Sequence, residues 1–174
     1  MNMRARALIN SLKNAPLLAG DLPDARCFDR SLLGDAGNDV VLNFEQKLGH
    51  LYEEALRVLI DAAPSLTCLA SHLQIFDKEG RTIGELDYVL RDEINRRHIH
   101  LELAVKFYLA LEEGGVWRFP GPNATDNWHK KIEKMRAHQL RLSRRPEART
   151  ILHEQYGITD IVEVRQLIYG RLFF

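Results

Sequence analysis

The chain has few of the features that would assign it to a specialised class of protein. Its 174 residues include only two cysteines, Cys27 and Cys68, whose separation matches no metal-binding or redox motif. No apolar run approaches the ~20 residues needed to cross a bilayer. The N-terminal segment carries Arg4, Arg6 and Lys13 in place of an export signal. We therefore expect a reduced, cytoplasmic protein that does not associate with membranes.

The chain also has no net charge. It contains 24 Lys and Arg against 24 Asp and Glu, so no global field attracts nucleic acid or an anionic membrane. We find no internal repeat and no low-complexity segment. The composition, with 45% hydrophobic and 28% charged residues, fits one globular domain with a sizeable core. Any basic surface must therefore be local.

Hydrophobic periodicity predicts the order helix, three strands, helix, strand. Apolar residues recur every three or four positions before Pro64, as in an amphipathic helix, and three strand-like runs follow with a hairpin turn at 77–80. We expect an antiparallel meander with the helix on its apolar side. The predicted segments are helix 44–62, strands 66–76, 82–90 and 98–109, loop 112–125, helices 127–143 and 147–156, and strand 161–174. Thr125 or Asp126 is the predicted cap of the helix that starts at 127.

Two regions are expected from these segments. Residues 1–43 would form a short helix, over 4–18, and a connecting segment, since 21–39 is rich in Gly, Asp and Pro. Residues 44–174 would form the main domain, of class α/β, with a mixed sheet flanked by helices.

The strand over 98–109 alternates strictly. Its odd positions are all apolar, whereas the even positions are His98, His100, Glu102, Ala104, Lys106 and Tyr108. Such alternation is typical of a strand with one apolar face and one chemically active face. On the preceding strand Glu85 and Asp87 share a face, about 6.5 to 7 Å apart from two residues at ~3.3 Å each.

Asp87 can face Glu102 on the neighbouring strand. Carboxylates that converge where strands lie ~4.8 Å apart repel one another unless a cation neutralises them. Mg²⁺ prefers such oxygen ligands, can polarise a phosphoryl group and lowers the pKa of a bound water. Glu53, one helical turn after Gly49, would add a further carboxylate. Glu54 competes with it but lies nearer the exposed side of the predicted helix.

These residues resemble a known superfamily. Gly84-Glu85-Leu86-Asp87 followed by Glu102 on a strand resembles the PD-(D/E)xK nucleases, in which helix, three strands, helix and strand form a restriction-endonuclease-like core. More specifically, the chain from about residue 44 is similar to the bacterial domain-of-unknown-function family 1853, which is grouped with these nucleases. The similarity rests on Leu48-Gly49 with Glu53, on 82–87 and 101–109, on Gly121-Pro122-Asn123 with Asp126, and on Gln139-Leu140 with Leu142-Ser143.

The resemblance implies Asp87 and Glu102 as ligands of Mg²⁺ or Mn²⁺, Glu53 as the acid of the helix, and Glu85 as an accessory carboxylate. The superfamily pattern places a lysine two residues after Glu102, where this chain has Ala104. Lys106 lies on the same face another ~6.6 Å along the strand, and Lys130 or Lys131 could supply the ammonium instead. Family members usually continue past a segment like 169–174, which implies a chain that is short or trimmed at its C-terminus.

Basic residues are concentrated between 130 and 149, where only Glu133 and Glu147 oppose them. Beside a nuclease-like face this run predicts contacts with phosphates. The expected contact residues are Lys130, Lys131, Lys134 and Arg141. Nucleic acid is the expected partner, with DNA preferred over RNA. The formation of a homodimer is left as an open question.

Two functions follow from these patterns. The first is a metal-dependent nuclease, a phosphodiester hydrolase. In it Asp87 and Glu102 hold the ion, and Lys106 orients the attacking water or offsets charge in the transition state. The second is a nuclease-like module that has lost its chemistry and binds nucleic acid or a protein, which the displaced lysine favours. His98 and His100 could ligate a transition metal, but no third ligand is evident. A Ser-His-Asp hydrolase is set aside because the sequence shows no obvious nucleophile.

Overall fold

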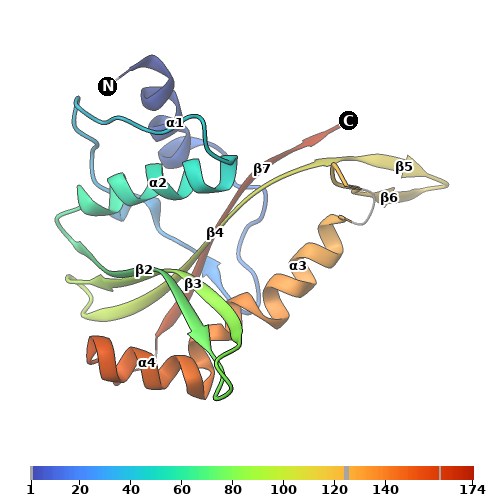
Figure 1. The fold of residues 1–174 in the computed structure, drawn as a ribbon. Coiled ribbons are helices and arrows are strands. Elements are labelled where there is room, and N and C mark those ends of the chain that lie inside the picture. The colour runs from blue at the N-terminus through green and yellow to red at the C-terminus, as the bar shows by residue number, and fades with distance from the viewer. Residues whose placement is uncertain (1, 124–125, 161) are drawn as a thin grey trace.

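The computed structural model describes residues 2–123, 126–160 and 162–174. Two residues that bounded or capped predicted segments, Thr125 and Ile161, lie outside the described residues. The chain folds as a mixed α/β domain with a five-stranded mixed sheet in the order β1-β7-β4-β3-β2. Helices cover both faces of this sheet (Figure 1). Within the described part of the chain, no helix combines the length and the apolar character that a membrane crossing requires.

The helices and strands have the following bounds. The helices are α1 (Met3–Asn14), α2 (Leu48–Asp61), α3 (Trp128–Ala137) and α4 (Pro146–Tyr156), with short 3₁₀ helices η1 (Arg30–Leu32) and η2 (Gln139–Arg144). The strands are β1 (Arg26–Cys27), β2 (Leu66–Phe76), β3 (Thr82–Asp92), β4 (Arg97–Leu109), β5 (Leu111–Glu113), β6 (Val116–Arg118) and β7 (Glu163–Phe173).

The predicted antiparallel meander of β2, β3 and β4 is confirmed, and its two ladders differ in length. β3 pairs with β2 along most of both strands. It pairs with β4 only as far as Tyr88 and Leu101. β4 continues beyond that point as the parallel partner of β7, up to Leu109 and Phe173. β3 and β4 therefore separate in the middle of the sheet.

The apolar face of β4 packs against α2, as its alternation predicts. Ile99, Leu101 and Leu103 belong to the same buried cluster as Leu56 and Leu59 of α2. Residues of α1 join this cluster, so the N-terminal helix shares the core of the main domain. Figure 1 shows α1 and α2 on one side of the sheet and α3 and α4 on the other.

The opposite face is covered by α3, η2 and α4. Ala104 packs there with Met135 and Leu140, while Val89 of β3 packs against Leu142 and Leu152. This face carries the even positions of β4, so the helices that follow β4 lie directly over its polar side chains.

The helix predicted over 127–143 is broken into two parts. α3 ends at Ala137, and His138 has φ −123° and ψ −69°, outside helical geometry. The chain then continues as η2, which turns Leu140 and Leu142 into the core. The cap of α3 is Asn127, whose side chain accepts a hydrogen bond from the backbone N–H of His129 at 2.9 Å, so the prediction of Asp126 was wrong.

The loop predicted over 112–125 contains a β-hairpin. β5 and β6 pair antiparallel across Gly114 and Gly115, which have φ values of +60° and +79°. Glycine adopts these left-handed conformations without steric cost, so the two residues form the turn. The sequence signal was present in the Gly-Gly pair, but each flanking strand is only three residues long.

Candidate functional site

The candidate site lies where β3 and β4 separate. Asp87 is the first residue of β3 beyond the paired region, and continuation of the register would place it opposite Glu102. Its Oδ2 atom instead accepts a hydrogen bond from the backbone N–H of Leu103 at 2.8 Å. The side chain of Asp87 thus takes the place of a backbone partner for Leu103. The two predicted metal ligands, Asp87 and Glu102, lie where the two strands separate.

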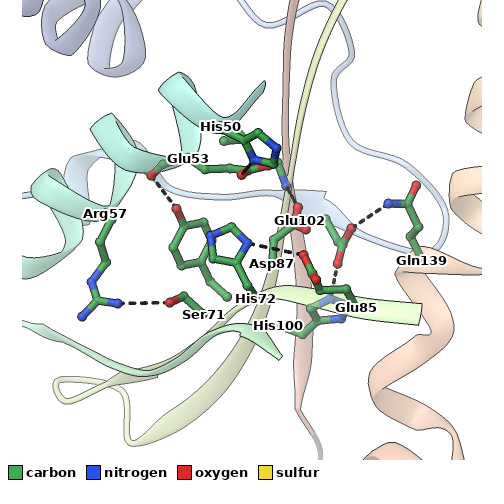
Figure 2. A network of polar contacts seen from close by, with 12 residues as sticks. His50, Glu53, Arg57, Ser71, His72, Glu85, Asp87, His100, Glu102 and Gln139 are labelled. Carbon is green, nitrogen blue, oxygen red and sulfur yellow. Dashed lines mark hydrogen bonds and ion pairs between the residues drawn. The ribbon is translucent and has the colours of Figure 1, made fainter. Parts of the chain in front are cut away.

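Glu102 is fully buried, and both of its carboxylate oxygens have partners. His100 Nε2 lies 2.6 Å from Oε1, and Gln139 Nε2 donates to Oε2 at 3.3 Å. The orientation of the Gln139 amide is fixed by Lys131, whose Nζ donates to Oε1 of Gln139 at 3.1 Å. Figure 2 shows Glu102 between His100 and Gln139, close to Asp87.

A cleft of about 520 Å³ opens beside these residues. Glu85 and Asp87 of β3 form one wall, and Lys131 and Lys134 of α3 form another. The remaining lining residues are Ile83, Gly84, His138, Gln139 and Leu142. Carboxylates and ammonium groups therefore face one space.

Asp87 has a strongly raised pKa in this site. Burial raises the pKa of Asp87 to about 8, and the negative charge of Glu102 acts in the same direction. Glu53 and Glu85 add to this shift, whereas the N–H group of Leu103 opposes it. A cation bound beside Asp87 would relieve the repulsion.

The lysines of the opposite wall show the complementary effect. Burial lowers the pKa of Lys131, and the positive charges of Lys106 and Lys134 lower it further. Glu102 raises it in part. Lys106 thus lies near Lys131 on the same face, although it does not line the cleft. Lys130 and Lys131 were the predicted alternatives to Lys106. Of these two, Lys131 lines the cleft together with Glu85 and Asp87.

Glu53 and Glu54 on α2 have different contacts. Glu54 accepts hydrogen bonds from the backbone of Asn43 at 3.2 Å and from the side chain of Gln46. Glu53 contacts His50 Nδ1 at 3.0 Å, and its charge contributes to the pKa of Asp87. Glu53 is therefore the helix carboxylate that faces the site (Figure 2).

Glu85 has a partner on the neighbouring strand. His72 Nδ1 lies 3.3 Å from Glu85 Oε1, and His72 adopts φ +53° in the middle of β2. This residue stands opposite Asp87, between the pairs Ser71–Tyr88 and Leu73–Leu86. The strand is thus irregular beside the candidate site, where non-glycine residues with positive φ often occur.

The predicted nucleic-acid contacts are divided by the structure. Lys131 and Lys134 line the cleft, and Lys130 is exposed on α3 outside its lining. Arg141 Nη2 instead pairs with Asp24 at 3.1 Å, beside a second ion pair from Arg136 to the same carboxylate at 2.8 Å. The positive charge of Arg141 is thus partly offset by Asp24.

Sequence reasoning missed the roles of His100, Gln139, Ser143 and Gln166. Gln166 is fully buried beside Glu102 in the β4–β7 register, and its Nε2 donates to Gly20 O at 2.9 Å. Its Oε1 has no partner among the described residues. Polar residues that interrupt an apolar strand signal such positions, but their partners come from segments that are distant in sequence.

Ser143, His100 and Glu102 are connected in the order of a catalytic triad. His100 Nδ1 lies 3.1 Å from Ser143 Oγ, and the other ring nitrogen contacts Glu102. However, Ser143 is 3% exposed and lines a cavity of only about 50 Å³, which cannot admit an acyl substrate beside the hydroxyl. Since both nitrogens of His100 are occupied, the ring also offers no lone pair to a metal.

Asp87 and Glu102 are the carboxylates of the site that could hold a metal ion. In the described ranges, no group of three or more His, Cys, Asp or Glu side chains is placed to enclose a metal. Mg²⁺ is commonly bound by one or two carboxylates, with waters and substrate phosphates completing its shell. Asp87, whose pKa is raised first by burial and then by the charge of Glu102, could form such a pair with Glu102.

Fold and site together define a mixed α/β domain in which the half-buried Asp87 lines a cleft shared with two lysines, beside the fully buried Glu102. The chain belongs to the family described as domain of unknown function DUF1853, whose model matches residues 12–174, and the resemblance to this family is confirmed. Neither the curated proteins nor the solved structures gave a match.

Proposed function

We propose that this protein is a metal-dependent nuclease of the PD-(D/E)xK superfamily that hydrolyses phosphodiester bonds in DNA, with RNA as the second choice. One observation carries the proposal. The acids Asp87 and Glu102 meet where two strands separate, and the ammonium groups of Lys131 and Lys134 flank the adjoining cleft. An anionic ester that needs both a cation and fixed positive charge suits this combination.

The arrangement of the elements supports the superfamily placement. α2 precedes the meander of β2, β3 and β4, and a helical segment then leads to β7, which lies parallel to β4. This is the order of helix, three strands, helix and strand on which the resemblance rests. Asp87 on the second strand of the meander and Glu102 on the third occupy the positions of its acids.

Each residue has a distinct role in the proposed reaction. Asp87 and Glu102 hold Mg²⁺ or Mn²⁺, and Glu53 and Glu85 keep the surrounding potential negative. The bound ion supplies Lewis acidity toward the phosphoryl group and a water of lowered pKa. Lys131 lies across the cleft, where its ammonium group offsets negative charge that develops on the phosphate.

Lys131 takes the place of the lysine that the superfamily pattern puts at Ala104. Ala104 packs in the apolar cluster with Trp128 and Ile132, beneath the start of α3. The helix that covers Ala104 thereby brings its own lysine to the carboxylates. Lys106 remains nearby and lowers the pKa of Lys131 by its charge.

The proposal is tested by cleavage assays on linear duplex, plasmid, single-stranded DNA and RNA in Mg²⁺ or Mn²⁺. We expect Asp87→Ala and Glu102→Ala to abolish cleavage. Glu79→Ala, in the exposed β2–β3 turn where its partner is Arg81, is the matched control and should keep full activity. Cleavage that persists in both site variants would reveal a contaminant and refute the assignment.

Two observations favour the inactive module as a second candidate. Both oxygens of Glu102 are already hydrogen-bonded, and no lysine follows at position 104. In that case calorimetry would show Mn²⁺ binding that depends on Asp87, without cleavage of any substrate.

A further inference from the structure

Glu102 belongs to a chain of hydrogen bonds beneath the cleft. The order is Lys131, Gln139, Glu102, His100 and Ser143, with successive distances of 3.1, 3.3, 2.6 and 3.1 Å. The chain links α3, η2 and β4. It places a buried imidazole behind the carboxylate and an amide on its other side.

The burial of this pair needs a physical explanation. His100 and Glu102 are both 0% exposed. Taking a carboxylate out of water is costly, and apolar residues of similar volume are often neutral or stabilising in place of a buried ion pair. Fold stability alone therefore gives little reason for a histidine at this position. A histidine that controls the geometry of the Glu102 carboxylate would be a sufficient reason.

The hydrogen bonds determine how that control works. His100 Nε2 must carry a proton to donate to the carboxylate, and the Ser143 hydroxyl meets the other ring nitrogen. With both nitrogens engaged, the ring cannot rotate without losing a buried hydrogen bond. The carboxylate is in turn held by two donors, from His100 and Gln139, so its two oxygens have fixed directions.

We propose that His100 is a positioning residue that presents the Glu102 carboxylate to the metal. This inference rests on the proposed function and deepens it by naming a residue that acts through a ligand. Partners that hold a metal ligand commonly change metal affinity by 10–100-fold when they are replaced. His100 touches no substrate, and its influence passes through Glu102 alone.

Two substitutions distinguish the contact of His100 Nε2 with Glu102 from the contact of Nδ1 with Ser143. In His100→Gln the side-chain amide nitrogen lies near the position of Nε2 and can still donate to Glu102. In His100→Asn the shorter amide lies near Nδ1, where it can contact Ser143 but not Glu102. His98→Asn is the matched control, because His98 also contacts a carboxylate, Asp160, at 2.7 Å, but away from the cleft.

The measurement is Mn²⁺ binding by titration calorimetry, with thermal unfolding as the check of folding. We expect His100→Asn to bind Mn²⁺ on the order of 10–100-fold more weakly than the unmodified protein. His100→Gln and His98→Asn should bind within a few-fold of it. In cleavage assays the Mn²⁺ concentration for half-maximal rate should rise in His100→Asn, and saturating Mn²⁺ should restore most of the rate.

The outcomes distinguish this inference from the proposed function. If the unmodified protein binds Mn²⁺ through Asp87 and both folded His100 variants bind equally well, the positioning role is refuted while the metal site stands. Equal weakening in the Gln and Asn variants would also refute it, because it would indicate a general packing defect. If the unmodified protein binds no Mn²⁺, the metal site and the positioning role both fall.

Discussion

Gly84 of β3 and Leu142 of η2 are in contact at the base of the cleft. A methyl group on Gly84 would lie 2.6 Å from Leu142 Cδ2, closer than side-chain atoms normally approach. The absence of a side chain at Gly84 thus allows η2 to pack against the strand that carries Asp87. The same contact helps to position Gln139 at the start of η2.

Gly84→Ala should destabilise the protein by about 1–3 kcal/mol, because the added methyl group overpacks the contact with the buried Leu142 side chain. Urea denaturation measures the change. Gly49→Ala is the control, since an added methyl group meets open space in α2 and should be neutral or slightly stabilising. The double variant with Leu142→Ala should lose less free energy than the two single losses summed. Full additivity would contradict the contact.

The pKa of Asp87, raised to about 8, predicts the pH dependence of stability. An unfolded aspartate titrates near 3.9. Between about pH 4 and pH 8 the folded state therefore binds more protons at Asp87 than the unfolded state, and the free energy of unfolding falls as pH rises. Without divalent metal, the melting temperature should drop from pH 5 to pH 9, and the drop should be smaller in Asp87→Asn. Identical slopes in the two proteins would contradict the shift.

Lys131 should contribute more to cleavage than Lys106. Lys131→Met should lower kcat on the order of 10²-fold, as for loss of one charge-stabilising donor. Lys106→Met should lower it less, because Lys106 lies outside the cleft lining. Each variant loses one ammonium group, and Lys131→Met also loses the hydrogen bond to Gln139, so single-turnover rates at saturating Mg²⁺ compare the full contribution of each lysine. A larger loss of rate in Lys106→Met would instead indicate that Lys106 of β4 stabilises the charge on the phosphate.

Lys134 and Arg141 should differ in their effect on nucleic-acid binding. Lys134 faces the cleft, whereas Arg141 is paired with Asp24. Lys134→Ala should weaken DNA binding and reduce the slope of log affinity against log salt by about 1. Arg141→Ala should leave the slope nearly unchanged. Fluorescence anisotropy with Asp87→Asn as the background avoids cleavage, and equal slopes for the two variants would contradict the division.

Several parts of the site could be predicted because they depend on local pattern. The strict alternation of β4 separates Glu102 and Lys106 from the apolar residues that pack on α2. The short spacing between Glu85 and Asp87 places both on one strand wall of the cleft. Such features follow from the two-residue period of a strand, which requires no knowledge of distant partners.

Other parts depended on contacts between distant segments. The break at His138, which turns Gln139 toward Glu102, is not signalled by proline or glycine. The pairing of Arg141 with Asp24 joins residues 117 positions apart, and no local pattern shows that this charge has a partner within the protein. The left-handed backbone of His72, between the pairs Ser71–Tyr88 and Leu73–Leu86, likewise has no signal in the local sequence.

The N-terminal segment closes one edge of the sheet. β1 pairs parallel with β7, and the backbone N–H groups of Leu18 and Phe28 donate to Ile168 O and Gln166 O at 2.7 and 3.0 Å. A fragment that began at residue 44 would leave these carbonyl groups without their partners. It would also expose apolar side chains of α2 that α1 now covers. Such a bare strand is a template for pairing with other chains, so the segment protects the domain against aggregation.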